Sequence, residues 1–279
     1  MSAIVAIRHA QLSSMWRIKM KEERLKFLQP ILDTFENEDI KNFAITLMDD
    51  IPEYIWHVGA SSTGKYHPAY SLGEGGLMRH QIAVVRFLNF FFALEQYNTK
   101  FTSREKDLMR LAGLAHDCMK SGTQEQYSVS KYTKFDHPIL MAKKIRECAG
   151  YLPEDELELV ANIISKHMGQ WNTDKKSSLE LPKPNDKYSR LVHLADYLAS
   201  RKDLTMDFSG YSVVQNTIEF DPEYKITFGK HTGKRLIDVY SKHPDYIAWC
   251  EENIHRADFL QMIDAMKSYL KNKESGHEN

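Results

Sequence analysis

The sequence has few cysteines and no grouping of them that would support a disulfide framework or a zinc site. Its three cysteines are Cys118, Cys148 and Cys250, an odd number at wide spacing with no CxxC motif. This usage is typical of a reducing compartment. The N-terminus lacks a charged segment before its short apolar run and a small-residue cleavage pattern, so we expect no signal peptide and a cytoplasmic protein.

The chain also lacks an excess of either charge and a long hydrophobic run. It has 37 Lys and Arg against 38 Asp and Glu, so no global positive field draws it to nucleic acid or a membrane surface. Its most apolar stretch, residues 87–94, is interrupted by Asn89 and is far too short to span a bilayer. What remains is an ordinary globular composition, 42% hydrophobic and 27% charged over 279 residues. We therefore expect a main domain with a small appendage and no membrane partner.

Apolar residues recur at helical spacing along most of the chain, and no strand-like alternation occurs before about residue 211. The pattern predicts an all-α main domain, a helical bundle, followed by a small α+β C-terminal module. A short strand is expected over 211–218, and a strand, a turn and a helix from Lys225 onward. The expected division is an N-terminal helical arm (1–50), the main domain (51–205), a linker (206–223) and the C-terminal module (224–279).

The glycine-rich segment 57–78 contains Gly-Ala-Ser-Ser-Thr-Gly-Lys, which has the spacing of a phosphate-binding P-loop. Tyr66 stands where that motif needs Ser or Thr, no apolar strand precedes it, and His67-Pro68 follows in place of a helix. Because the motif binds phosphate only between a strand and a helix, we reject a nucleoside-triphosphatase function.

A set of ionisable residues falls at helix ends or on otherwise apolar helices. A helical bundle can aim such residues at one interior point, and imidazole with carboxylate suits Mn, Fe, Ni and Zn. Burying an Asp within Val-His-Leu-Ala-Asp-Tyr-Leu-Ala is costly unless it binds a cation or a paired donor. The sequence thus predicts a site for one or two divalent transition-metal ions, with Mg²⁺ also compatible. The six expected ligands are His80, His116, Asp117, His137, His167 and Asp196.

This ordered set resembles the HD-domain superfamily of metal-dependent phosphohydrolases over about residues 55–205. Its local motifs are similar to those of the HD domains of bacterial 3′-to-5′ exoribonucleases. It is carried by His67-Pro-Ala-Tyr before Gly-Gly-Leu-Met-Arg-His80, by His116-Asp-Cys-Met-Lys120 and by Lys166-His167-Met-Gly-Gln-Trp171. Such nucleases usually show two histidines where this chain has Lys166-His167, and an oligonucleotide-binding β-barrel that is not evident before this domain.

The resemblance implies roles for individual residues. Asp117 would bridge two ions and take part in catalysis, and Lys120 would pair with a phosphoryl oxygen as charge develops there. His67 and Arg79 are further candidates for substrate phosphate, and Trp171 for stacking on a base. For His67 and Arg79 a surface role is an equal alternative, for Trp171 a packing role is at least as well supported, and for Lys120 the alternative is a solvated lysine after a helix.

The C-terminal module is similar to that of exodeoxyribonuclease X-like proteins, through Phe228-Gly-Lys-His-Thr-Gly-Lys-Arg-Leu-Ile-Asp-Val and His243-Pro-Asp-Tyr-Ile-Ala-Trp249. Between residues 225 and 242 there are five Lys or Arg and one acidic residue, Asp238. A basic turn flanked by glycines can present cations and backbone N–H groups to phosphate. We therefore expect Lys230, Lys234 and Arg235 to contact nucleic acid; a structural appendage with a solvated turn is the alternative.

The expected function is cleavage of a phosphoester in a nucleic acid or nucleotide, with nuclease or phosphodiesterase action favoured by the C-terminal module. A nucleotide phosphatase is a close rival, favoured by the near-neutral main domain. Two other classes stay open: a diiron oxygenase that uses the same six ligands, and a non-catalytic nucleic-acid-binding protein. Lys120 and the basic turn favour phosphate over oxygen chemistry.

Overall fold

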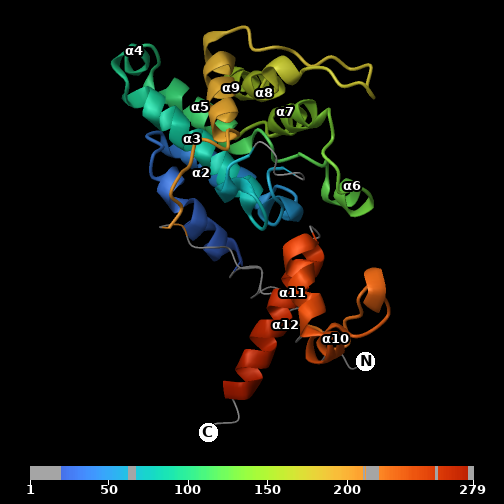
Figure 1. The fold of residues 1–279 in the computed structure, drawn as a ribbon. Coiled ribbons are helices and arrows are strands. Elements are labelled where there is room, and N and C mark those ends of the chain that lie inside the picture. The colour runs from blue at the N-terminus through green and yellow to red at the C-terminus, as the bar shows by residue number, and fades with distance from the viewer. Residues whose placement is uncertain (1–19, 62–66, 210, 212–219, 255–256, 276–279) are drawn as a thin grey trace, which may run out of the picture. The chain divides into compact units, whose positions relative to one another are not determined.

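The structure, a computed structural model, describes residues 20–61, 67–209, 211, 220–254 and 257–275 (Figure 1). It divides into two compact units, Met1–Val214 and Gln215–Asn279, called unit 1 and unit 2 below. The strand expected over 211–218 falls almost entirely outside the described residues.

Unit 1 is built from helices, which confirms the all-α prediction for the main domain. Short 3-10 turns join them at Glu53–Trp56 (η1), Ala69–Ser71 (η2) and Gly169–Trp171 (η3). After a helix over residues 20–32, the helices are α2 (Glu38–Asp49), α3 (Gly76–Ala93), α4 (Glu95–Asn98), α5 (Ser103–Ala115), α6 (Gln124–Val129), α7 (His137–Glu147), α8 (Glu154–Ser165) and α9 (Lys187–Ala199).

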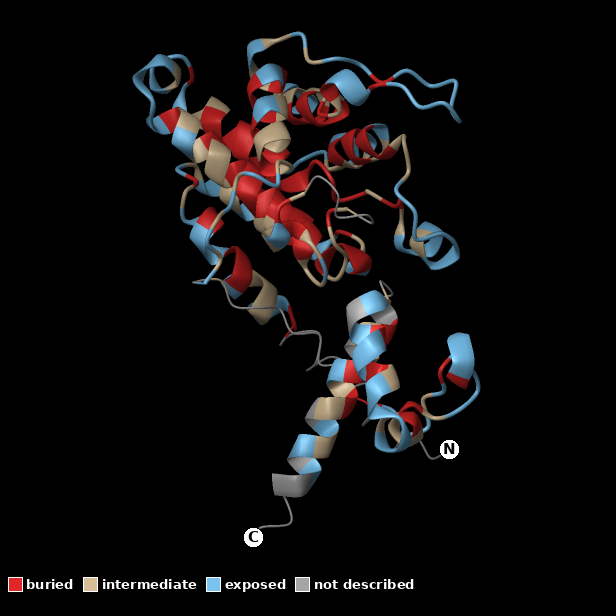
Figure 2. Cartoon of the chain, viewed as in Figure 1, coloured by how far each residue is buried: buried red, intermediate tan, exposed pale blue. Residues whose placement is uncertain are grey.

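The core of unit 1 lies where α3, α5 and α9 pack together and α8 packs against α5 and α7. Buried residues concentrate along these helices (Figure 2). The helix α3 buries Ile82, Val85 and Leu88, which recur at three-residue spacing on one face. The first turn of α3, the end of α5 and the middle of α9 therefore meet inside the bundle.

The N-terminal helices belong to the same core. Phe27, Leu28 and Phe43 are buried together with the side chains of α3 and α5. A buried carboxylate on α5, Asp107, ties the start of α2 to the bundle. Its Oδ2 accepts hydrogen bonds from the backbone N–H of Glu36 and of Asn37 at 2.9 and 2.7 Å and from the Asn37 amide at 2.7 Å.

Replacing Asp107 by Ala is expected to destabilise unit 1 by about 3–5 kcal/mol, because it leaves Arg110, which donates to Asp107 Oδ1 at 2.5 Å, without its buried partner. Urea unfolding followed by circular dichroism measures the change. The matched control is Asp50→Ala, which removes a largely exposed carboxylate paired with Lys144. Equal stability of the two variants would contradict the assigned role of Asp107.

Unit 2 has its own small core, which includes Ile226, Leu236, Val239 and Phe259. The described part of this unit contains a 3-10 turn and three helices, and its β structure is the single antiparallel pair Lys225–Arg235. The short strand expected at Lys225 is thus reduced to one residue pair, whereas the turn and the following helices form as expected. These elements are η4 (Gly229–His231), α10 (Leu236–Lys242), α11 (Pro244–Asn253) and α12 (Ala257–Ser275).

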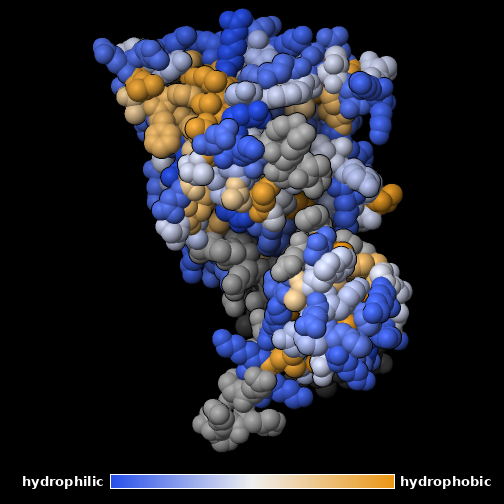
Figure 3. All heavy atoms as spheres, in the orientation of Figure 1, coloured by the Kyte–Doolittle hydropathy of each residue, from blue (hydrophilic) through white to orange (hydrophobic). Residues whose placement is uncertain are grey.

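Within the described part of the chain, no helix combines the length and the apolar character needed to cross a bilayer. The surface view shows hydrophobic side chains gathered on one side of unit 1, over α3 and α4 (Figure 3). Phe90 and Leu94 are exposed there.

Candidate metal centre

The six residues predicted as ligands come from five helices or helix ends that meet in the core of unit 1. A capping box between Thr102 and Glu105 begins α5, whose buried apolar run ends at His116 and Asp117. His80 lies in the first turns of α3 and Asp196 in α9. His137 is the first residue of α7, and His167 follows the end of α8 by two residues.

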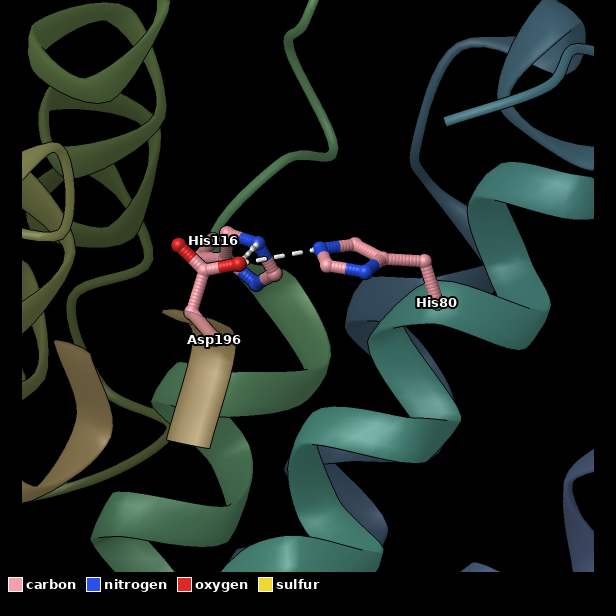
Figure 4. Close-up of side chains that lie close together, drawn as sticks. All are labelled: His80, His116 and Asp196. Atoms are coloured by element: carbon pink, nitrogen blue, oxygen red, sulfur yellow. Dashed lines mark ion pairs between the residues drawn. The ribbon is translucent and has the colours of Figure 1, made fainter. Parts of the chain in front are cut away.

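One group consists of His80, His116 and Asp196 (Figure 4). Asp196 Oδ1 lies 3.0 Å from His80 Nε2 and 3.7 Å from His116 Nε2. Two ligand atoms that each lie about 2.1 Å from one ion are themselves about 3.0–3.4 Å apart at tetrahedral or octahedral angles. The three side chains thus converge closely enough to share a cation.

The second group surrounds Asp117, which faces both sides of the centre. Its Oδ1 lies 3.0 Å from His137 Nε2 and 3.6 Å from His167 Nε2. Its Oδ2 lies 3.6 Å from His116 Nε2 and 2.5 Å from Lys120 Nζ. A carboxylate whose two oxygens point to different histidines can bridge two ions.

The orientation of three of these histidines is set in the same way. In each, ring Nδ1 donates to the backbone carbonyl three residues earlier, so the proton is on Nδ1 and the lone pair of Nε2 points into the centre. The pairs are His116 with Gly113 at 2.8 Å, His137 with Lys134 at 2.6 Å and His167 with Ile164 at 2.8 Å.

This arrangement leaves the centre rich in acceptors and poor in donors. The Nε2 atoms of His137 and His167 lie 3.2 Å apart, although each ring already donates through Nδ1. The buried atoms His116 Nε2 and Asp117 Oδ1 have no hydrogen-bond partner. Facing lone pairs in a buried site are unfavourable unless a cation lies among them. The residues therefore fit a divalent metal, and His80, His116, Asp117, His137, His167 and Asp196 would hold it.

Electrostatics in the centre favour the protonation states that ligands need. Burial lowers the pKa of His116 to about 4 and also lowers that of His137, so both rings are neutral near neutral pH. Burial alone would raise the pKa of Asp117, but Lys120 and the neighbouring histidines hold it well below its usual value. His167 is the exception: burial alone would lower its pKa, but the negative charge of Asp117, 3.6 Å away, outweighs burial and raises it.

Of the residues predicted to contact substrate, Lys120 and His67 lie beside the candidate ligands, whereas Arg79 does not point to them. Lys120 contacts Asp117, and its side chain is 17% exposed, so it lies between the centre and solvent. The His67 ring lies 5.9 Å from that of His80, and burial lowers its pKa to about 4. The Arg79 guanidinium donates to the carbonyls of Tyr70 and Leu72, so it holds the loop before α3 rather than pointing to the ligands.

Trp171 stands at the edge of this region. It is 44% exposed and stacks on Tyr197, the residue after Asp196, with ring centroids 5.9 Å apart and planes at 15°. Sequence reasoning missed Tyr197 and also His193, whose Nδ1 donates to the carbonyl of His167 at 2.7 Å. The available signal was that His193 precedes Asp196 by three residues and so shares its helix face.

The extra lysine noted before His167 does not enter the centre. Lys166 Nζ pairs with Asp186 at 3.2 Å and contacts Asn185 at 2.6 Å. Only one imidazole, that of His167, is therefore supplied from this turn.

In unit 2, the three residues predicted to contact nucleic acid have different surroundings. Lys230 and Lys234 are exposed. Arg235 is held by Glu223 and Asp238, each at 2.8 Å. The cations of this turn that remain available to a partner are thus the two lysines.

Two family models match separate parts of the chain, one in unit 1 and one in unit 2. Residues 78–201 match the family model of the HD domain, which includes all six candidate ligands. The chain carries an HD domain. Residues 226–255 match the Exodeoxyribonuclease X-like C-terminal domain. HD domains are generally metal-dependent phosphohydrolases and bind divalent metals. Comparisons with curated proteins and with solved structures gave no significant match.

The metal-free protein is expected to lose stability as pH falls from 6.5 to about 4. His116 has a folded pKa of about 4 against an ordinary value of 6.5, so the unfolded chain takes up its proton first. Denaturant unfolding in the presence of a chelator measures the slope. His116→Gln should reduce it by about 1.4 kcal/mol per pH unit within this window. Identical slopes for the two proteins would contradict a buried neutral His116.

Proposed function

We propose that this protein is a metal-dependent hydrolase of a phosphoester in a nucleic acid or nucleotide, with phosphodiester cleavage favoured. The observation that carries the proposal is the donor-poor cluster around Asp117, with the Lys120 ammonium on its solvent side. The donor-poor cluster indicates bound cations, and the Lys120 ammonium indicates an anionic substrate held against those cations. The HD-domain match supports the reaction class, and the C-terminal match supports the substrate class.

A bound divalent ion would polarise a phosphate oxygen and lower the pKa of a water molecule. The chain's own contribution is to hold the ligands before substrate arrives, since three imidazoles are anchored through backbone carbonyls. Once the Asp117 carboxylate serves as a ligand, the Lys120 ammonium is available to a phosphoryl oxygen. A preorganised cation at that position stabilises the charge that develops during hydrolysis.

The same observation ranks the rival functions. A nucleotide phosphatase would use the same centre and Lys120, and it remains the nearest alternative. A diiron oxygenase would need the six ligands but has no use for an ammonium 2.5 Å from the bridging carboxylate. A purely binding protein would not need a complete set of six convergent ligands.

Two substitutions test the catalytic assignment. Asp117→Asn should abolish Mn²⁺-dependent hydrolysis of oligonucleotides and nucleotides while the helical circular dichroism spectrum is kept. Lys120→Ala should lower kcat about 10²–10³-fold without loss of bound metal, because it removes one stabilising cation. Lys143→Ala, which changes an exposed lysine of α7, is the matched control.

Three outcomes would contradict the proposal. Asp117→Asn with undiminished activity would place the reaction elsewhere. Release of inorganic phosphate from mononucleotides alone would replace the nuclease assignment with a nucleotidase. Oxygen consumption with a diiron spectrum would replace hydrolysis altogether.

We also propose that unit 2 contributes to nucleic-acid binding through Lys230 and Lys234. The turn that carries them contains Gly229 and Gly233, whose φ values of 71° and 83° suit glycine and turn the backbone sharply. This geometry presents both lysines to solvent. Because Arg235 is already paired within the unit, its role is to hold the turn against Glu223 and Asp238.

The double substitution Lys230→Ala and Lys234→Ala should reduce the salt dependence of single-stranded DNA binding by up to about 1.4 in the log–log slope, about 0.7 for each lost phosphate contact. Fluorescence anisotropy over a salt series measures it. Arg235→Ala is the comparison. It should lower the free energy of unfolding of unit 2 and leave the salt dependence of DNA binding nearly unchanged. If the salt dependence is unchanged in the double variant, the two lysines do not contact nucleic acid.

A further inference from the structure

A pocket lies beside the candidate metal centre and shares none of its ligands. Its volume is about 320 Å³, near the lower end of the range for small-molecule sites, roughly 300–1,000 Å³. It is lined by Gly169, Gln170, Lys183, Pro184, Arg190 and His193.

His193 connects this pocket to the centre. Its Nδ1 donates to the carbonyl of His167, and it precedes Asp196 by three residues on α9. Residues three apart on a helix share a face and lie within one turn of about 5.4 Å. The pocket therefore begins about one helical turn from the candidate ligands.

The close packing of this wall depends on a glycine. Gly169 has a φ of 57°, and a Cβ at this position would lie 2.1 Å from His193 Cε1. Any larger residue would displace the His193 imidazole, which lines the pocket and donates to the His167 carbonyl. The turn η3 thus packs directly on the His193 ring.

The pocket carries two cations that form no ion pair within the described part of the chain. Lys183 and Arg190 are exposed, and neither forms an ion pair with a described residue. The nearest acid on the preceding turn, Asp186, is paired with Lys166. Two unpaired cations in a chain of net charge −1 favour an anionic occupant.

An aromatic surface adjoins the same pocket. The Trp171 ring meets the edge of His193 at 6.4 Å and stacks on Tyr197. The Arg201 guanidinium lies over the Tyr197 ring, 4.5 Å from its centroid. Trp171 is therefore held by its neighbours while 44% of it stays exposed. A rigid, exposed indole is suited to stacking on a nucleobase.

We propose that this pocket binds a phosphate group of the substrate other than the one that is cleaved, and that Trp171 stacks on an adjacent base. Lys183 and Arg190 supply the contacts to that phosphate. A single-stranded polynucleotide has both a second phosphate and unstacked bases. A nucleoside di- or triphosphate also has both, but its phosphates are adjacent, whereas the pocket shares no residue with the candidate metal centre. A duplex keeps its bases stacked on one another, and a nucleoside monophosphate has no second phosphate. The inference rests on the proposed function and narrows its substrate class.

Binding of fluorescein-labelled hexamers of deoxythymidine and of uridine to the full-length protein tests the inference. The measurement uses Asp117→Asn protein, so that hydrolysis does not interfere. Adding Trp171→Ala should weaken binding about 5- to 150-fold, the effect expected for loss of one stacked base. Adding Lys183→Ala and Arg190→Ala should lower the salt slope by about 0.7, because both cations contact the same phosphate.

Matched controls are Phe90→Ala, which removes an aromatic residue that is 58% exposed on α3, and Lys143→Ala. Both should bind the hexamers like the parent, and circular dichroism should be unchanged in all variants. Two results would overturn the inference: the Trp171 and Lys183/Arg190 variants bind within twofold of the parent, or thymidine 5′-monophosphate or 5′-triphosphate binds as tightly as the hexamer.

Failure of the proposed function would be seen separately. It would appear as absence of Mn²⁺-dependent phosphoester hydrolysis by the wild-type protein, with the binding differences still present. Failure of the pocket assignment would leave hydrolysis intact and remove the binding differences.

Discussion

In the interior of unit 1, the Nε2 atoms of His116, His137 and His167 and the oxygens of Asp117 face one another at separations between 3.0 and 3.6 Å. All three rings already carry their proton on the far side, where Nδ1 donates to a backbone carbonyl. Lone pairs and a carboxylate gathered out of water repel one another and lose hydration. A cation removes both penalties, so the arrangement makes sense as a preformed metal centre.

The helical bundle supplies this arrangement at little local cost. Each of these three histidines bonds to a carbonyl three residues earlier, which lies in the last turn of a helix for His116 and His167 and in the loop before α7 for His137. Helix ends and first turns can therefore orient imidazoles without further polar residues in the core. The Lys120 ammonium contacts Asp117 and its side chain is partly exposed, so a phosphate would approach the centre there. The exposed Trp171 and the basic pocket adjoin the same turn after His167.

Much of this could be predicted from the sequence because it depends on local patterns. The apolar periodicity of α3, α5 and α9 predicts the bundle, and the order of His and Asp at helix ends indicates the candidate ligands. What could not be predicted depends on which groups meet in space. Arg79 has the right charge and position for a phosphate contact, yet its guanidinium is taken by carbonyls of the preceding loop. His193 gains its place only because residues 169–184 fold back on α9.

Anomalous X-ray diffraction from crystals of the full-length protein grown with Mn²⁺ tests the central claim most directly. The account predicts two anomalous peaks on either side of Asp117, one within bonding distance of His80, His116 and Asp196 and the other near His137 and His167. A single peak that omits His137 and His167 would reduce the centre to one ion. The absence of any peak at Asp117, with the six side chains ordered, would contradict the account.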